Sequence, residues 1–184
     1  MPEERLGRGA VPTLSLAHNL LLSRRDAVGP LGWLHLGRLR TQAAEIIARY
    51  QVKANGPEAP ARSLSGGNLQ KFIVGREIEG LRAHSESTRA PALLIVSQPT
   101  WGVDVGAAAQ IRGQILALRD AGCAVLVVSE ELEELFDLSD RLHVIAKGRL
   151  SPALPRAEAT VERIGEWMSG LWPQAAQEVG HVAA

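Results

Sequence analysis

The sequence predicts an α/β fold in which helices come first and a mostly parallel sheet with flanking helices follows. Two short runs, Leu93–Val96 and Ala124–Val128, contain only aliphatic residues without polar alternation, which is typical of strands covered on both faces. Between them, apolar residues recur at helical spacing from 108 to 118 and stop at Asp120-Ala121-Gly122. The order strand, helix, strand predicts a βαβ unit.

The stretch before the first strand has helical periodicity. Ser15–Leu22 is amphipathic and predicts one or two helical turns between loops. Apolar positions recur from Leu39 to Tyr50 and predict a helix of about three turns, which we expect Asn55-Gly56-Pro57 to end.

A longer helix is predicted after the glycine-rich turn Ser65-Gly66-Gly67. Apolar residues from Leu69 to Leu81 keep to one helical face. His84–Arg89 is polar and aperiodic, so we expect a surface loop there before Pro91.

The C-terminal third predicts two more helices and a hairpin. Ser129 precedes the acidic run Glu130–Glu134 and is expected to cap a helix that these carboxylates stabilise through its dipole. The turn Lys147-Gly148 predicts a hairpin after Leu142–Ala146, and Thr160–Leu171 predicts a final helix before a mobile tail. The expected apolar side of that helix consists of Val161, Ile164, Met168 and Leu171.

Length and charge restrict the class of protein. The 184 residues suit one domain or most of one, and 20 basic residues balance 20 acidic residues, which disfavours a nucleic-acid partner. The single cysteine, Cys123, adjoins an apolar run and is expected to be a small buried side chain in a reducing cytosol. The apolar runs are too short to span a bilayer, and no export signal is expected from the N-terminus.

Four short segments follow one another in the order Leu64–Gln70, Leu93–Thr100, Gly102–Asp104 and Val125–Glu130. Together they resemble the ABC ATPase family, in which the corresponding pieces are the signature motif, the Walker B strand, the D-loop and the switch segment. Gln98–Ala107 is similar to the second cassette of fused simple-sugar and nucleoside importers.

The opening residues 2–9 also resemble a segment of that cassette. The resemblance implies that the chain is an incomplete P-loop NTPase-like ABC cassette, similar to the C-terminal part of that second cassette. In that arrangement residues 1–90 are a remnant of the core plus the helical signature subdomain. Residues 91–150 are the Walker B, D-loop and switch half, and residues 151–184 are a C-terminal helix and tail.

The turn Ser65-Gly66-Gly67 suits anion binding for reasons independent of the resemblance. Glycines let backbone N–H groups approach an anion, the helix directs its positive end outward, and the serine hydroxyl adds a donor. An ordinary helix-opening turn is the alternative when the tripeptide is taken alone. The resemblance implies that Ser65, Gly66, Gly67, Asn68 and Gln70 contact the nucleotide held by the opposite cassette, in trans.

Two departures from the family remove catalytic chemistry. The sequence contains no Gly-Lys-Ser or Gly-Lys-Thr, so the phosphate-binding loop is missing from it. Ser97 and Gln98 occupy the positions of the magnesium-associated aspartate and the general base, and Glu130 occupies the switch position, which is usually histidine. We expect Ser97 and Gln98 to be polar strand-end residues rather than parts of a recruited mechanism, and no ATP hydrolysis by the isolated chain.

Asp104 is the best retained acidic position. The resemblance implies a D-loop residue that couples two composite sites, while a helix cap is the equally weighted alternative. Trp101 stands where the family usually has a basic residue. The five histidines have no zinc-like pair spacing, so no metal site is predicted.

The resemblance implies an ATP-binding component of an ABC importer for simple sugars or nucleosides. Its implied partners are a second nucleotide-binding cassette, with ATP and Mg at a composite site, and membrane permease subunits. It would lie in the cytoplasm at the inner face of the membrane. The alternative is a catalytically silent truncated fragment or interaction module, and the neutral charge disfavours a soluble ABC ATPase acting on DNA or ribosomes.

Overall fold

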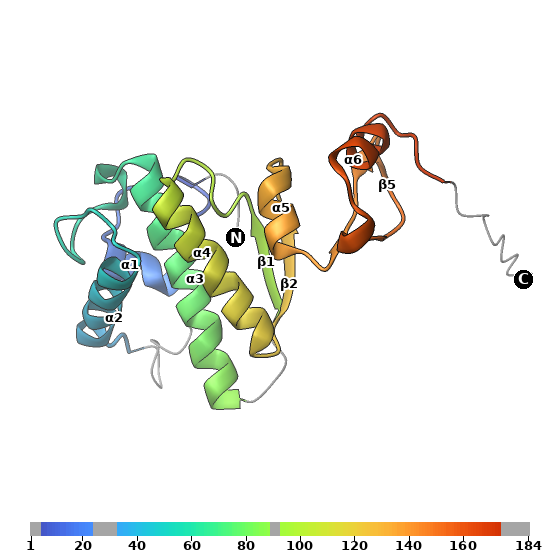
Figure 1. Ribbon diagram of the computed structural model, residues 1–184. Helices are drawn as coiled ribbons and strands as arrows, with labels where there is room; N and C mark the ends of the chain where they lie inside the picture. The colour runs from blue at the N-terminus through green and yellow to red at the C-terminus, as the bar shows by residue number, and fades with distance from the viewer. Residues whose placement is uncertain (1–4, 24–32, 89–92, 174–184) are drawn as a thin grey trace, which may run out of the picture. The chain divides into compact units, whose positions relative to one another are not determined.

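The computed structural model describes residues 5–23, 33–88 and 93–173 (Figure 1). The chain divides into two compact units, residues 1–130 and 131–184, and each is described by itself. Within the described ranges, no helix combines the length and the hydropathy needed to cross a bilayer.

The first unit begins with short helical turns and one regular helix. These are α1 (Leu16–Asn19), the 3₁₀ turn η1 (Leu20–Leu22), α2 (Leu36–Arg49) and the 3₁₀ turn η4 (Ala61–Ser63). The helical turns predicted within Ser15–Leu22 are confirmed, and Ser15 caps α1 by accepting from the His18 N–H at 3.2 Å. The predicted end of α2 at residues 55–57 is wrong, because Gln51 adopts a left-handed φ of 50° directly after the helix.

Helix α3 (Gly66–Thr88) opens at the glycine-rich turn, as predicted, and runs for 23 residues. The loop predicted for His84–Arg89 is wrong over residues 84–88, which are helical, and Arg89 lies outside the described residues. Polar residues lower helix propensity by only a few tenths of a kcal/mol each, and neither glycine nor proline interrupts this stretch. A polar composition therefore did not indicate a loop.

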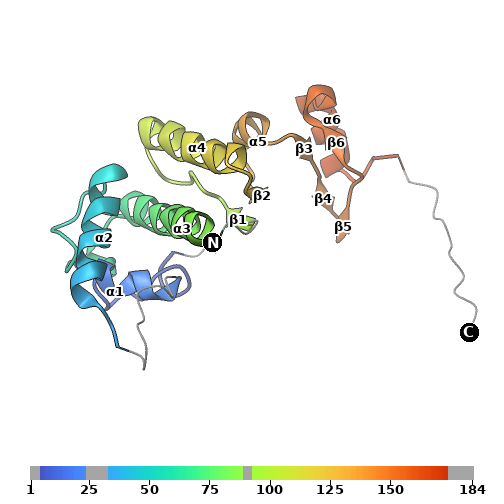
Figure 2. The same ribbon diagram turned by 90° about the horizontal axis from the view of Figure 1, so that it is seen from below.

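A buried cluster joins the N-terminal turns to α2 and α3 (Figure 2). Its largest fully buried side chains include Tyr50, Phe72 and Leu16. At the rim, the Glu79 carboxylate of α3 accepts hydrogen bonds from the Arg49 guanidinium at 2.7 Å and the Tyr50 hydroxyl at 3.1 Å. Both donors lie at the end of α2. These contacts fix α2 on the helix that carries the glycine-rich turn.

The predicted βαβ unit is confirmed. Strand β1 (Leu93–Ser97) pairs in parallel with β2 (Ala124–Val128), and helix α4 (Val105–Asp120) connects them. Helix α4 packs against both α3 and β2 (Figure 1). Cys123, just before β2, is buried as expected.

The prediction that both faces of these strands are covered is wrong. Leu94 and Val96 are buried, but Leu93 and Ile95 are 58% and 51% exposed. Their register partners place Leu126 on the same open face, where it is 52% exposed. Branched aliphatic composition predicted the strands but could not reveal that the two-stranded sheet has one open face.

The second unit contains α5 (Leu132–Leu138), α6 (Val161–Met168), the 3₁₀ turn η5 (Arg156–Glu158) and two short antiparallel pairs. The predicted hairpin is confirmed as β4 (Ile145–Ala146) with β5 (Arg149–Leu150), and β3 (Arg141–Leu142) pairs with β6 (Leu154–Pro155). The predicted cap at Ser129 is wrong, because Glu131 occupies the N-cap position of α5 and its side chain makes no capping bond.

The final helix is present, but its buried side differs from the prediction. Thr160 caps α6 by accepting from the Arg163 N–H at 3.2 Å. Ile164 and Trp167 are buried, whereas Val161 and Met168 are 58% and 64% exposed and Leu171 lies beyond the helix. The Trp167 ring lies in the same buried cluster as Ile164, so packing around this large ring decided the orientation.

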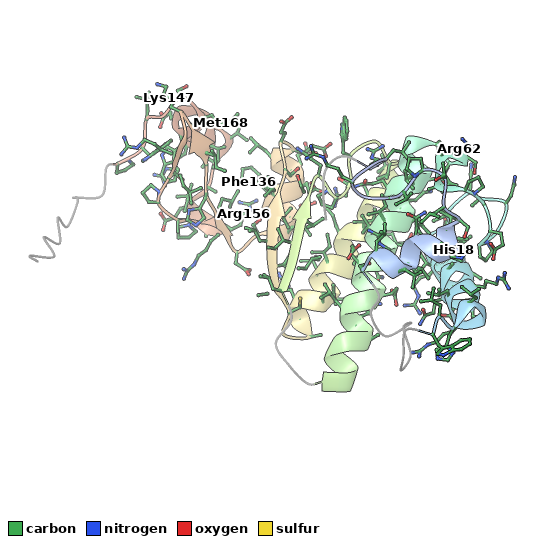
Figure 3. All side chains as sticks on the ribbon, turned by 180° about the vertical axis from the view of Figure 1, so that it is seen from behind. His18, Arg62, Phe136, Lys147, Arg156 and Met168 are labelled. Atoms are coloured by element: carbon green, nitrogen blue, oxygen red, sulfur yellow. The ribbon has the colours of Figure 1, made fainter. Side chains whose placement is uncertain are left out.

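The interior of the second unit is completed by a stacked pair. The Arg156 guanidinium carbon lies 4.2 Å from the centroid of the Phe136 ring, and Arg156 Nε donates to the Phe136 carbonyl at 2.8 Å (Figure 3). This pair joins η5 to α5.

The open face of the sheet generates the first prediction. Replacing both Ile95 and Leu126 with threonine should lower the fluorescence of a bound hydrophobic dye by about half, because exposed apolar surface binds such dyes. Threonine keeps β propensity, so the strands should persist in circular dichroism. Val105→Thr is the matched control, since Val105 is 85% exposed but lies on α4. An equal loss of fluorescence in the control would contradict the assignment.

Candidate functional site

The glycine-rich turn is exposed and internally braced. The Asn68 amide donates to Ser65 Oγ at 2.8 Å, while Asn68 Oδ1 accepts from the Lys53 N–H at 2.8 Å. The Ser65 carbonyl accepts from the Leu69 N–H at 2.9 Å, the first bond of α3. Since the first N–H groups of a helix have no intrahelical acceptors, this turn presents donors and the positive helix end together with the Ser65 hydroxyl.

Close packing explains one of the two glycines of the turn. A Cβ on Gly67 would lie 2.5 Å from the Gly102 carbonyl oxygen, closer than real Cβ contacts allow. A Cβ on Gly66 would lie 2.6 Å from Nη1 of Arg5, the end of a flexible side chain. Gly67 is therefore required by backbone packing, whereas Gly66 is adjacent to a movable cation.

Gln70 faces inward rather than toward solvent. It is 2% exposed, and its amide nitrogen donates to the carbonyls of Gln98 at 2.8 Å and Pro99 at 3.0 Å. It thus ties α3 to the end of β1. A nucleotide contact by Gln70 stays a prediction, as it does for Ser65, Gly66, Gly67 and Asn68.

Ser97 and Gln98 lie at the end of β1 as predicted. Gln98 has a left-handed φ of 49°, and its N–H donates to the Val128 carbonyl at 2.8 Å. Its side-chain oxygen accepts from the Ser129 hydroxyl at 3.3 Å and lies 3.5 Å from the N–H of exposed Glu130. This amide braces the two strand ends, and an amide cannot take a proton as a general base at neutral pH.

Asp104 is a helix cap by geometry. Its carboxylate accepts from the Ala107 N–H at 2.9 Å at the start of α4 and lies 3.6 Å from Nζ of Lys71. The hydrogen bond from Ala107 and the charge of Lys71 lower the pKa of Asp104, so the carboxylate is ionised at neutral pH. The cap explains the residue locally, and the coupling role stays a prediction.

Two cations near the turn were not predicted as site residues from the sequence. Lys71 is 7% exposed and donates to the Gln51 carbonyl at 3.2 Å as well as approaching Asp104. Arg5 donates to the Trp101 carbonyl, and its guanidinium carbon lies 4.8 Å from the centroid of that ring. Arg5 lies in segment 2–9, which resembles part of the same cassette, but the resemblance assigned no role to Arg5.

The arrangement places donors and cations around the glycine-rich turn. A hydroxyl, helix-end N–H groups and two cations suit the binding of an anion such as a phosphate group. In the described ranges, no group of three or more His, Cys, Asp or Glu side chains is placed to hold a metal ion.

Sequence comparison gives relatives of defined activity. The chain is 40% identical over 172 residues to the guanosine import ATP-binding protein NupO of Bacillus subtilis, which covers 92% of this chain and 32% of that protein. It is 37% identical over 172 residues to the nucleoside import ATP-binding protein NupA of Lactococcus lactis, with the same coverage. It is 40% identical over 174 residues to the glucose import ATP-binding protein TsgD13 of Haloferax volcanii, over 92% of this chain and 30% of that protein. No protein-family model matches the chain.

Solved structures agree in fold. The ATP-binding cassette MJ0796, a dimer bound to ADP and phosphate, matches with a TM-score of 0.61 and 19% identity over 82% of this chain and 61% of that one. An ATP-binding subunit of an ABC transporter matches with a TM-score of 0.68 and 15% identity over 92% and 67% of the respective chains. The chain spans about a third of the length of its curated relatives. It is, over that share, a relative of nucleoside and sugar import ATP-binding proteins, and it has the fold of an ABC ATPase cassette.

Proposed function

We propose that the chain is an ATP-binding component of an ABC importer for simple sugars or nucleosides, and that it contributes its glycine-rich turn in trans to a partner's ATP site. The observation that carries the proposal is the exposed Ser65 hydroxyl at the positive end of α3, in a chain 40% identical to a guanosine import ATP-binding protein. Relatives that import glucose and ribose support the wider class of solute.

In this proposal, a partner cassette holds ATP and Mg and supplies the acidic chemistry. Ser65 and the N–H groups of Gly66 and Gly67 donate to the γ-phosphate, and these bonds strengthen as charge develops in the transition state. Residues 1–90 act as the signature subdomain and residues 91–150 as the half that contains the Walker B strand. Closure of the composite site is passed to permease subunits at the inner face of the membrane.

One feature favours a second candidate, a catalytically silent fragment or interaction module. Gln98 and Gln70 are both used in internal hydrogen bonds that maintain the fold without any nucleotide. A neighbouring reading frame that encodes a phosphate-binding loop, next to permease genes, would favour the importer over this candidate.

The 184-residue chain should not bind Mg-ATP by itself. Its sequence lacks the Gly-Lys-Ser/Thr loop that cradles phosphates, and Ser97 and Gln98 carry no charge for the metal. Calorimetric titration should give no saturable heat at micromolar ATP, and the double change Ser97→Asp with Gln98→Glu should not restore it. Tight stoichiometric binding by the unaltered chain would contradict the proposal.

Ser65→Arg should lower the ATPase rate of a reconstituted transporter containing this chain and its partner cassette by on the order of a hundredfold, because a preorganised donor is replaced by a bulky side chain. Ser63→Ala is the control, since Ser63 is also exposed but its hydroxyl bonds locally to the Pro60 carbonyl at 2.7 Å. Steady-state phosphate release measures both. Unchanged turnover with Ser65→Arg would favour the silent fragment.

Two substitutions at Asp104 separate its role as a helix cap from the effect of its charge. Asp104→Asn keeps a side-chain oxygen for the Ala107 N–H and removes the charge near Lys71, whereas Asp104→Ala removes both. Thermal unfolding should therefore be nearly unchanged in the first variant and shifted to lower temperature in the second. If the carboxylate couples the composite sites, both variants should lower the partner-dependent ATPase. Full activity with asparagine would limit Asp104 to capping.

A further inference from the structure

Arg5 lies where the first turn of α3 meets the turn that follows β1. Its Nη2 donates to the Trp101 carbonyl, and its Nη1 lies beside Gly66. We propose that Arg5 is a positioning residue that fastens the Ser65–Gly67 turn to the Trp101–Asp104 turn. The inference rests on the function proposed above, because it concerns the shape and movement of the same site.

The backbone of Arg5 is itself anchored on α3. The Arg5 carbonyl accepts from the Ala10 N–H at 2.7 Å, and the Ala10 carbonyl accepts from the Gly7 N–H at 2.8 Å, which closes a tight turn. A Cβ on Gly9 would lie 2.9 Å from the Arg5 carbonyl oxygen and 3.0 Å from Cδ1 of Ile73, so this turn packs closely on the helix. A side chain that starts from a fixed backbone loses less entropy when it makes further contacts.

Trp101 offers Arg5 two contacts at once. The planar guanidinium stacks over the ring at 4.8 Å from its centroid while one of its nitrogens donates to the carbonyl of the same residue. A lysine ammonium cannot make a planar stack and a directed bond together. The pair accounts for a tryptophan that is 54% exposed on a turn.

The described contacts of Arg5 are a stack on a ring and a hydrogen bond to a carbonyl. Among the described residues, no carboxylate forms an ion pair with Arg5, and its Nε is buried without a hydrogen-bond partner. A cation beside the N-terminal end of a helix is disfavoured by the helix dipole. Stacking and the bond to Trp101 therefore hold Arg5 against an opposing electrostatic effect, as expected of a fastening contact.

The fastening has a mechanical consequence. Gly67 already touches the Gly102 carbonyl, and Lys71 of α3 approaches Asp104 at the other end of the same turn. Together with Arg5, which lies beside Gly66, these contacts hold the Trp101–Asp104 turn to α3 at three points. A displacement of that turn is then passed to Ser65 and Gly66.

Amide hydrogen exchange on the 184-residue chain tests the inference without any partner. Arg5→Met removes the charge and the donors but keeps the length, and it should lower protection about tenfold at two separated amides, Leu69 of α3 and Val103 of the turn. Arg5→Lys should restore part of the protection at both. Arg62→Met is the matched control, because Arg62 is an exposed arginine on η4 (Figure 3) and should leave both amides unchanged.

A double-mutant cycle gives a readout that general destabilisation would not produce. Trp101→Ala removes the stack but keeps the carbonyl that accepts from Arg5, so it should reproduce part of the loss in Arg5→Met, and the double variant should lose no more than Arg5→Met alone. Additive losses, or a change confined to residues 5–10, would overturn the inference. If Arg5→Met does not fold, Trp101→Ala still tests the contact, because it removes the stack by changing a residue that is 54% exposed.

The outcome is separable from the proposed function. Coupled loss of protection supports the positioning role even if Ser65→Arg leaves a partner's ATPase unchanged, which would overturn only the function in trans. Conversely, if Arg5→Met lowers that ATPase while exchange at Leu69 and Val103 stays unchanged, Arg5 acts by direct contact with the phosphate and the positioning role is wrong.

Discussion

The close approach of Gly67 to the Gly102 carbonyl is the contact on which the site depends. No side chain fits between the first turn of α3 and the turn after β1, so the two backbones determine each other's position. Gln70 then reaches the carbonyls of Gln98 and Pro99 within hydrogen-bond distance. The Ser65 residue and the start of α4, which Asp104 caps, lie on either side of this contact.

The second constraint is the sheet, whose two parallel strands have one buried and one open face. Parallel strands usually bury both faces, and their composition here is suited to that environment. Ile95 and Leu126 therefore form an exposed apolar face.

Regular elements were predictable from sequence because their signals are local. Strand composition gave the βαβ unit, and the glycine-rich turn gave the start of α3. Packing determined what the pattern could not: the left-handed Gln51 ended α2 early, and Trp167 turned α6 to a different buried side. Motif order predicted that Ser65, Gln98 and Asp104 belong to the candidate site, and their roles stay predictions. Arg5 and Lys71 act through contacts distant in sequence, which no local pattern contains.

The strand ends retain the cassette geometry while their chemistry is different. At position 98 the side-chain oxygen accepts a hydrogen bond from Ser129, and the backbone carbonyl accepts one from Gln70. A carboxylate there could accept the same bonds from the Ser129 hydroxyl and the Glu130 N–H, and it could also take a proton. The neutral amide makes the same brace but cannot act as a base. The side chain at position 98 therefore braces the ends of β1 and β2, and its chemistry agrees with the proposed function, in which the partner supplies the base.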